Sequence, residues 1–331
     1  MAVCRVLVVT NLWPFPGDPG YGSFVKAQME SLRPLGVEYD LLFINGRVSR
    51  WNYLRSVRQL RRRLRASHYD LIHAHMGLSG WVARCQMRVP VVVSFLGDDV
   101  LGKYDCRGRI TFYGRFLRAC SYILARLVRS VIVKSDEMKR RLRLESAHVI
   151  PNGVDLNLFR PLDCAEVRHA LGLDPAKKFV LFPYNREELR KRYDLVESAV
   201  ARARGQVPEL EILHVYRVPQ EQMPLYMNAA DLMVMASMIE GSPNAVKETL
   251  ACNLPVVTVE VGDTAELLEH TEGHHLVPRE VGAIAAGIVE VCRRGTRARS
   301  REKMGQFSIE RVAERVLGVY QGAISGVDGR L

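Results

Sequence analysis

The chain has 331 residues, which is too long for one ordinary hydrophobic core and comfortable for two domains. Hydrophobic residues make up 48% of the sequence and charged residues 25%, as in soluble globular proteins, and no run of about 18 apolar residues predicts a membrane-spanning helix. The net charge is +11, and the seven cysteines form no Cys-x-x-Cys pair. This cysteine usage argues against a disulfide framework or a zinc site and favours a reducing cytoplasm.

The excess of basic residues lies entirely in the first half of the chain. Residues 1–160 contain 26 Lys and Arg against 12 Asp and Glu, whereas the remaining residues contain 21 against 24. Such an imbalance predicts a polyanionic partner for the first half: anionic lipid, a phosphorylated acceptor or nucleic acid.

Strand-like and helix-like runs alternate in the first half, which is typical of a doubly wound α/β sheet. After the first strand, a loop rich in glycine and proline leads into a helix, and Gly22 in this loop would permit a ligand to approach the backbone closely. The predicted strands cover residues 5–10, 38–44, 71–73, 91–95, 131–133 and 148–150, and the predicted helices include 24–35 and 53–65.

Polar residues follow the third and fourth of these strands. His75 comes just past the third strand, and Asp98 and Asp99 follow the fourth. Ligands of doubly wound sheets bind beyond the carboxyl ends of the strands, so these residues are candidates for contact with a ligand. A structural histidine and a loop-capping aspartate are the competing interpretations.

A boundary between two domains is predicted near residues 152–163, where the turn dipeptide Asn152-Gly153 and Pro161 occur. We expect an N-terminal domain over residues 1–155, a second domain over 156–305 and a final segment over 306–331 that begins with an amphipathic helix. The second domain would contain strands near residues 178–183, 211–215, 231–235, 255–259 and 275–277.

The stretch from Glu240 to Glu248 carries the strongest chemical signal. Ser242 is a favoured N-cap and Pro243 suits the first helical position, so a helix is predicted here between two buried strands. Its N-terminus would open at the carboxyl edge of a parallel sheet, where free N–H groups and the helix dipole favour phosphate. The predicted anion-binding residues are Gly241, Ser242, Asn244, Ala245 and Val246.

Glu240 and Glu248 bracket this anion site. A nucleotide sugar suits the arrangement, because it has an anionic diphosphate in the middle and hydroxyl groups at both ends. Two solvated carboxylates on a helix face are the alternative interpretation.

The sequence resembles the retaining glycosyltransferases of family 4 in this pair of glutamates and in the segments around them. These segments are Glu-Gly-Ser-Pro-Asn and, further on, Lys-Glu-Thr-Leu-Ala-Cys-Asn-Leu-Pro-Val-Val. The similarity is closest to members that build bacterial surface polysaccharides. It implies the GT-B fold, in which two Rossmann-like domains face each other across a cleft and the last helix crosses back to the first domain. It also implies that Glu240 contacts the donor sugar and Glu248 the ribose.

The same resemblance assigns the diphosphate to a pair of cations. Arg186 and Lys191 have the spacing and context of the family's Arg and Lys, which clamp the diphosphate between a strand and a helix. A solvated run of charge is the alternative, since Arg190 and Arg192 lie beside them. In the family, a glycine at the position of Gly22 meets the donor phosphates or the acceptor. The resemblance also implies that His75, Asp98 and Asp99 lie on the acceptor or sugar side of the site.

Two features of the sequence bear on the chemistry. Leu96 stands where the family often has a histidine beside the reacting sugar, which puts part of the usual site in doubt. No Asp-x-Asp occurs, so the motif that holds a metal–diphosphate in the other main glycosyltransferase fold is missing. We therefore expect no metal site and no cofactor, with Glu240, Arg186 and Lys191 as the catalytic residues.

The expected function is transfer of a sugar from a nucleotide-sugar donor, with retention of configuration, to a glycan acceptor carried on a lipid. The expected location is the cytoplasm, at the inner face of the cell membrane. Basic segments at residues 50–65 and 107–129, with apolar residues at helical spacing, predict peripheral binding to an anionic membrane surface. The sequence indicates neither the donor's base and sugar nor the acceptor.

Three other functions are less compatible with the sequence. A sugar-nucleotide epimerase of the same fold would need acid and base groups that face the sugar from the first domain. A module that binds nucleic acid or another polyanion would explain the basic half but not the paired glutamates, and no helix-turn-helix or ribonucleoprotein motif is present. A Rossmann oxidoreductase is disfavoured because no Gly-x-Gly-x-x-Gly follows the first strand.

Overall fold

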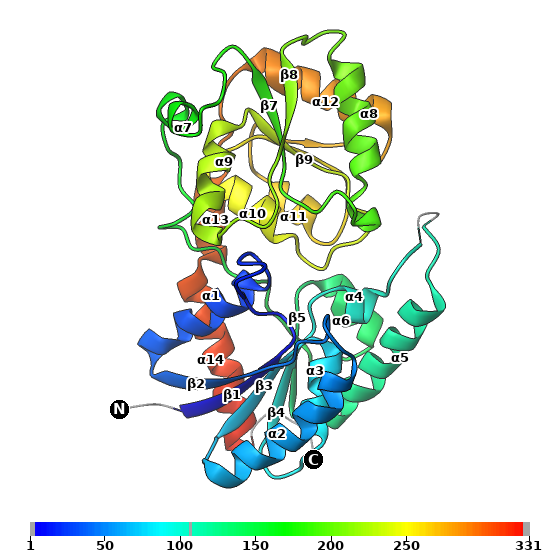
Figure 1. Cartoon of the computed structure of the whole chain (residues 1–331), viewed down its shortest axis with the longest axis vertical. Helices are drawn as coiled ribbons and strands as arrows, with labels where there is room; N and C mark the ends of the chain where they lie inside the picture. Colours follow the sequence, from blue (N-terminus) through cyan, green and yellow to red (C-terminus); the bar gives the residue numbers. More distant parts are fainter. Residues whose placement is uncertain (1–3, 106–107, 327–331) are drawn as a thin grey trace.

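Two parallel sheets, one in each half of the chain, organise the structure, a computed structural model that describes residues 4–105 and 108–326. Figure 1 shows the domain of the first half below and the domain of the second half above. The predicted class, two α/β domains that face each other, is confirmed.

The sheet of the first domain has six parallel strands in the order β2-β1-β3-β4-β5-β6. Its central strands are buried on both faces, which is why they appear in the sequence as continuous runs of aliphatic residues. The strands are β1 (Cys4–Thr10), β2 (Val37–Phe43), β3 (Leu71–His75), β4 (Val91–Ser94), β5 (Ser130–Val133) and β6 (His148–Val149).

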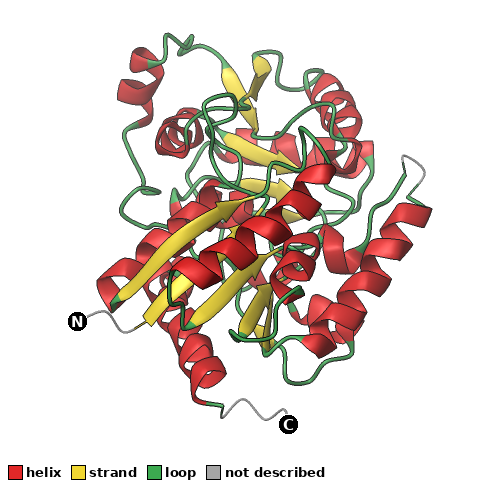
Figure 2. Cartoon of the chain, turned by 60° about the horizontal axis from the view of Figure 1, so that its bottom comes forward, coloured by secondary structure: helices red, strands yellow, loops and turns green. Residues whose placement is uncertain are grey.

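Helices cover both faces of this sheet (Figure 2). Leu7 and Val9 of β1 belong to the core beneath α2, α3 and α5, whereas Val6 and Val8 belong to the core beneath α1 and α14. The helices are α1 (Ser23–Leu32), α2 (Trp51–Ala66), α3 (Gly77–Arg84), α4 (Asp98–Leu101), α5 (Phe112–Leu127), α6 (Asp136–Leu142) and α14 (Ile309–Ser325), with the 3-10 turn η1 (Arg33–Leu35) after α1.

The sheet of the second domain has five parallel strands in the order β11-β10-β9-β7-β8. Helices α8 and α12 contribute to the core on one face, and α9, α10 and α13 to the core on the other. The strands are β7 (Lys178–Phe182), β8 (Leu210–His214), β9 (Leu232–Met235), β10 (Val256–Thr258) and β11 (His275–Leu276). The helices are α7 (Cys164–Ala170), η2 (Leu189–Lys191), α8 (Tyr193–Ala203), η3 (Gln220–Gln222), α9 (Met223–Ala229), α10 (Asn244–Ala251), α11 (Thr264–Leu268), α12 (Val281–Arg294), α13 (Arg301–Met304) and η4 (Gly305–Phe307).

The chain passes between the domains twice, and the two crossings touch. Ile150 packs in the core of the first domain and Val154 in that of the second, so the connection lies between them. Val154 exchanges backbone hydrogen bonds with Phe307 and Ile309, at the start of the return crossing. Gly153 lies so close to this crossing that a Cβ on it would come within 2.7 Å of Ile309 Cα.

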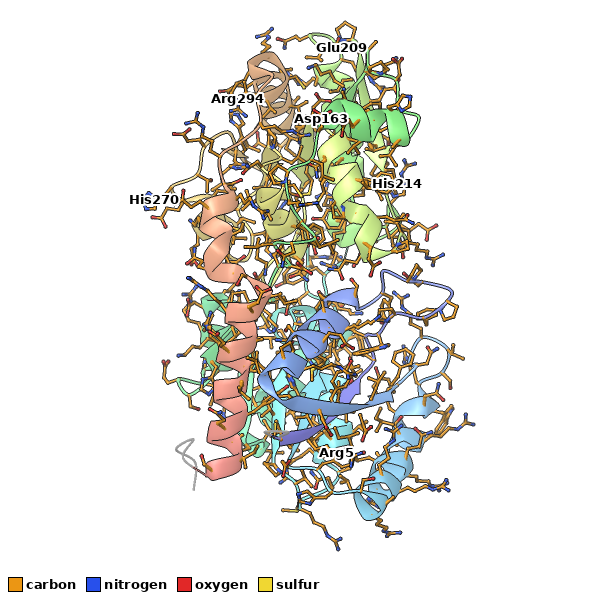
Figure 3. The ribbon with its side chains drawn as sticks, turned by 90° about the vertical axis from the view of Figure 1, so that its left-hand side faces the viewer. Arg5, Asp163, Glu209, His214, His270 and Arg294 are labelled. Carbon is orange, nitrogen blue, oxygen red and sulfur yellow. The ribbon has the colours of Figure 1, made fainter. Side chains whose placement is uncertain are left out.

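The last helix, α14, belongs to the first domain by its packing. Figure 3 shows it descending along the lower domain, which contains the labelled Arg5, whereas Asp163, Glu209 and Arg294 lie in the upper domain. Ser308 caps its N-terminus by accepting a hydrogen bond from Arg311 N. Near its other end, the hydroxyl of Tyr320 lies 2.6 Å from His73 Nδ1 in the core.

Two differences in extent from the sequence-based prediction bear on the functional site. Strand β3 continues to His75, because residues 71–75 pair with both β1 and β4. Helix α10 begins at Asn244, one residue later than expected, with Pro243 rather than Ser242 at the N-cap and no side-chain capping bond.

Within the described ranges, no helix is long and apolar enough to cross a membrane.

Candidate active site

A cavity of about 700 Å³ lies in the cleft between the two domains. Loops that follow β1, β3 and β4 line it from the first domain, and loops that follow β7 and β9 line it from the second. The carboxyl ends of both parallel sheets therefore point at one cavity, which is where α/β folds bind ligands.

The N-terminus of α10 opens into this cavity. The first bond within the helix is donated by Lys247 N to Pro243 O, so the helix does not use the N–H groups of Asn244, Ala245 and Val246. Gly241, Ser242, Asn244 and Ala245 line the cavity, whereas Val246 is buried behind them. The predicted anion-binding segment thus lies at the cavity, although Ser242 is not its cap.

Glycine is required where this loop meets the first domain. A Cβ on Gly241 would lie 2.9 Å from Met138 Sδ and 3.0 Å from Leu96 O. The backbone of the second domain therefore approaches the first domain closely beside the start of α10.

Glu240 accepts from two cations at the edge of the cavity. Its Oε1 lies 2.5 Å from Lys191 Nζ and 3.2 Å from Arg190 Nη1, and only 11% of its side chain is exposed. Burial raises the pKa of Glu240, but Lys191 and Arg190 outweigh burial and hold this pKa at about 2. Glu240 is therefore an ionised carboxylate that can accept hydrogen bonds from hydroxyl groups.

The cation beside Lys191 is Arg190 rather than Arg186. Arg186 is exposed, stacks 4.8 Å from the ring centroid of Tyr193 and is not among the residues that line the cavity. Arg190 lines the cavity and is also paired with Glu188 at 2.5 Å. Sequence spacing favoured Arg186, and no periodic pattern singles out Arg190, because the segment between β7 and α8 is irregular.

Glu248 lines the same cavity from the second turn of α10. It is half-buried, and burial raises its pKa to about 7 despite the neighbouring Lys247. Lys247 points elsewhere: it is fully buried and donates to Asn152 O at 2.7 Å, in the connection between the domains.

The residues predicted on the acceptor side have different surroundings. His75 is completely buried within β3, its ring stacked 4.1 Å from that of His73, and it does not line the cavity. Asp99 lines the cavity but accepts from the backbone N–H groups of Gly77, Leu96 and Gly97, so it holds the loops together. Asp98 also lines the cavity.

The local backbone conformation requires glycine at position 22. Its φ is +68°, and a Cβ would lie 2.4 Å from the carbonyl carbon of Leu12. Gly22 is not on the cavity lining, but its neighbours Tyr21 and Ser23 are.

Three further lining residues present buried polar atoms to the site. Tyr184 Oη, Asn11 Oδ1 and Trp81 Nε1 have no hydrogen-bond partner among the described residues. Buried polar groups are nearly always satisfied, so these atoms indicate where a ligand or water would bind. Sequence reasoning missed them, because nothing in an isolated Tyr, Asn or Trp marks the direction of its side chain.

In the described part of the chain, no three His, Cys, Asp or Glu side chains come together as a metal site.

The sequence of the chain is similar to those of known glycosyltransferases. Residues 4–158 match the profile described as Glycosyltransferase Family 4, and residues 185–294 match that described as Glycosyl transferases group 1. The chain is 24% identical over 347 residues to the putative teichuronic acid biosynthesis glycosyltransferase TuaC of Bacillus subtilis, covering 86% of this chain and 88% of that protein.

Solved structures show the same architecture. Sucrose-phosphate synthase from Thermosynechococcus elongatus superposes with a TM-score of 0.77 at 20% identity, over 97% of this chain and 99% of that one. Anabaena HepE in complex with UDP-glucose gives a TM-score of 0.69 at 17% identity, over 96% and 100%.

Two parallel-sheet domains around a shared cavity, with the open N-terminus of α10 in the second, have the architecture of the GT-B fold. Because both profiles match and together span most of the chain, the protein belongs to glycosyltransferase family 4.

Proposed function

We propose that this enzyme transfers a sugar, with retention of configuration, from a nucleoside-diphosphate sugar to a glycan acceptor. The observation that carries the proposal is the meeting of Glu240, Lys191 and Arg190 beside the open N-terminus of α10 in one cavity. This group combines cations and free N–H groups for a diphosphate with an ionised carboxylate for sugar hydroxyls.

The donor would lie along the second domain. The diphosphate would occupy the start of α10, within reach of Lys191 and Arg190, and the ribose would contact Glu248. Glu240 would orient the transferred sugar. As the bond to the sugar breaks, negative charge grows on the leaving diphosphate, and the fixed cations and helix end would stabilise it.

Without a donor, the cations of the site are paired with Glu240. In the absence of donor, Glu240 balances the buried charge of Lys191, which would otherwise be costly. A diphosphate that enters the site would share these cations with Glu240. Binding of the donor would therefore be coupled to the position of the Glu240 carboxylate, which orients the sugar. We propose that these cations perform the role for which other glycosyltransferases use a metal, and that no cofactor takes part.

The acceptor would enter from the first domain. The relative TuaC is named for teichuronic acid biosynthesis, which supports a role in polysaccharide synthesis. The basic first half of the chain supports an acceptor carried on a lipid, with the enzyme bound at the cytoplasmic face of an anionic membrane.

Calorimetric titration with UDP, GDP, ADP and their sugars tests the donor assignment. We expect saturable binding of one nucleoside diphosphate and its sugar, with weaker binding of the other bases. An enzyme that binds none of them would contradict the proposed function. With the donor identified, NMR of the product would show whether the anomeric configuration is retained.

A further inference from the structure

Helix α5 carries an apolar stripe on the side that faces away from the sheet. Its inner side packs on the core through Leu117 and Leu124. The outer residues recur at intervals of three or four, so they share one face of the helix, and at 1.5 Å per residue they extend over about 22 Å. This α5 stripe consists of Phe112, Phe116, Ala119, Ile123 and Leu127, all of which are exposed.

The exposure is large for such side chains. Phe112 is 87% exposed and Phe116 is 52% exposed. A surface helix normally turns polar residues outward, so an exposed contiguous apolar face indicates a surface that something else covers.

The α5 stripe is continuous with the cavity. Tyr113 lines the cavity, and its ring stacks on that of Phe116 with 6.5 Å between centroids. Lys103, which also lines the cavity, places Nζ 5.7 Å from the ring centroid of Tyr113. The end of the cavity in the first domain therefore opens beside the aromatic start of α5.

The first turn of α2 adds a second apolar rim. Tyr53 lines the cavity, and the neighbouring Trp51 and Leu54 are 69% and 62% exposed. Helices α2 and α5 both pack against α3 on the same face of the sheet (Figure 1), so the two apolar rims lie on one side of the molecule.

The charges of these helices select the partner. Within α2 and α5 there are nine arginines and no Asp or Glu. Arg58, Arg61 and Arg62 are exposed on α2, and Arg115 and Arg126 are exposed on α5. A second copy of the chain would bring two arginine-rich faces together, which like-charge repulsion disfavours. An anionic bilayer offers both negative headgroups and hydrocarbon.

We propose that the α5 stripe and the first turn of α2 dock on an anionic lipid bilayer, so that the acceptor end of the cavity opens at the lipid surface. This rests on the proposed function for its purpose, because an acceptor carried on a lipid could then place its headgroup between Tyr53 and Tyr113 while its hydrocarbon stays in the bilayer. Arginines around the rims attract the headgroups, and the exposed aromatic residues insert among them.

Sedimentation with vesicles tests the docking. The full chain is mixed with vesicles of equal parts phosphatidylglycerol and phosphatidylcholine, or of phosphatidylcholine alone. We expect binding to the anionic vesicles that weakens at high salt. Phe112→Ser with Phe116→Ser should lower the partition coefficient by about tenfold or more, because two exposed apolar anchors are removed. Arg58→Glu with Arg62→Glu should weaken binding as well.

Matched variants separate docking from folding and from donor binding. Leu276→Ser with Ile324→Ser also removes two exposed apolar side chains, one in β11 and one in α14, and should bind vesicles like the wild type. Calorimetry with UDP, GDP and ADP should give every variant the wild-type affinity for whichever nucleotide binds, because none of these residues lines the cavity. Failure of UDP, GDP and ADP alike to bind any of these proteins would contradict the donor assignment without affecting the vesicle result.

Three outcomes would overturn the docking proposal. The wild type fails to sediment with anionic vesicles, or the Phe112 and Phe116 double variant sediments as well as the wild type. Alternatively, ultracentrifugation shows a dimer that the double variant converts to a monomer, which would assign the α5 stripe to an interface between copies.

Discussion

Among single residues, Glu240 has the most demanding position, because one carboxylate oxygen accepts from both Lys191 and Arg190. The pair with Lys191 is almost fully buried, so the removal of either partner leaves an unpaired charge at the edge of the cavity. Because the cations are proposed to contact the diphosphate and Glu240 the sugar, variants at the cations test donor binding more directly than variants at the carboxylate.

Replacement of the cations one at a time shows whether Lys191 binds the diphosphate together with Arg190 or together with Arg186. Lys191→Ala and Arg190→Ala should each weaken nucleoside-diphosphate binding by about 1.5–3 kcal/mol, because each removes a charge-assisted contact. Arg186→Ala should have a smaller effect, since this side chain lies outside the cavity lining. Calorimetry on the three variants decides the matter. A loss at Arg186 that exceeds the loss at Arg190 would show that Arg186 swings into the site when donor binds.

Glu248 should make stability depend on pH. Its pKa in the folded chain is about 7, raised by burial above the ordinary value of 4.5 for glutamate. The folded state therefore holds the proton more tightly, so this group's contribution to stability is present below pH 4.5 and is lost as the pH rises through about 7. Because the side chain faces an open cavity, we expect a loss of about 1–3 kcal/mol.

Urea unfolding at several pH values measures this effect against Glu248→Gln, which cannot ionise. The stability of the wild type relative to the variant should fall between pH 4.5 and 7. Parallel pH profiles for the two proteins would mean that Glu248 has an ordinary pKa.

Spacing on regular elements was enough to predict part of the site. Glu240 and Glu248 could be placed at one cavity because a buried strand on each side fixes where α10 begins. Arg190 could not be predicted, since it lies in the single 3-10 turn η2, which is too short for a periodic pattern to orient a side chain. His75 was expected just past the strand, but pairing of β3 with β1 and β4 continues through it and buries it.

At the scale of elements, the connection between the domains is held from both sides. Lys134, buried after β5, donates to Ile150 O at 3.3 Å, and Lys247 of α10 donates to Asn152 O. The helix that carries the anion-binding N-terminus is thus fastened to the connection through its own side chain. Burial lowers the pKa of Lys134 to about 7 and that of Lys247 to about 8.

Replacement of two glycines by alanine, one beside α14 and one within it, should change the stability of the protein in opposite directions. Gly153→Ala would place a methyl group 2.7 Å from Ile309 Cα and force the two crossings apart, so we expect a loss of about 1–3 kcal/mol. Gly318 is an exposed residue in the middle of α14, and a Cβ added to it would have nothing within 4 Å. Gly318→Ala should therefore stabilise the protein by about 0.4–1 kcal/mol.

Denaturant unfolding of both variants provides the comparison, with Gly318→Ala as the control for a general effect of alanine. Equal stability of the two variants would show that the close approach of Gly153 to α14 is not maintained in solution.

At the scale of the whole molecule, neither domain contains a complete site. The second domain supplies the cations and the start of α10, while the first contributes Asn11, Trp81 and the loop after β4. The fold and its two sheets could be predicted from the alternation of runs along the chain. The shape of the cavity could not, because it depends on how the two domains meet.

Chelation of metals should leave the complete enzyme active. If Arg190, Lys191 and the N-terminus of α10 stabilise the leaving diphosphate, then turnover in EDTA should equal turnover in its absence, and added Mg²⁺ or Mn²⁺ should not increase it. Product formation measured with the identified donor gives the answer. Activity that disappears on chelation and returns with either cation would contradict the metal-free mechanism.

The return of α14 to the first domain constrains how the protein is made. Val6 and Val8 lie beneath Val316 and Tyr320, so one face of the first sheet has only part of its cover, from α1, until the end of the chain has been synthesised. Between Val149 and Ser325 the ribosome needs about 9–35 s at ordinary translation rates. The second domain, whose sheet and surrounding helices lie within residues 164–307, can finish folding during this interval. The domain that is translated first is therefore the last to be completed, and a nascent chain exposes an apolar strand face that chaperones recognise until α14 arrives.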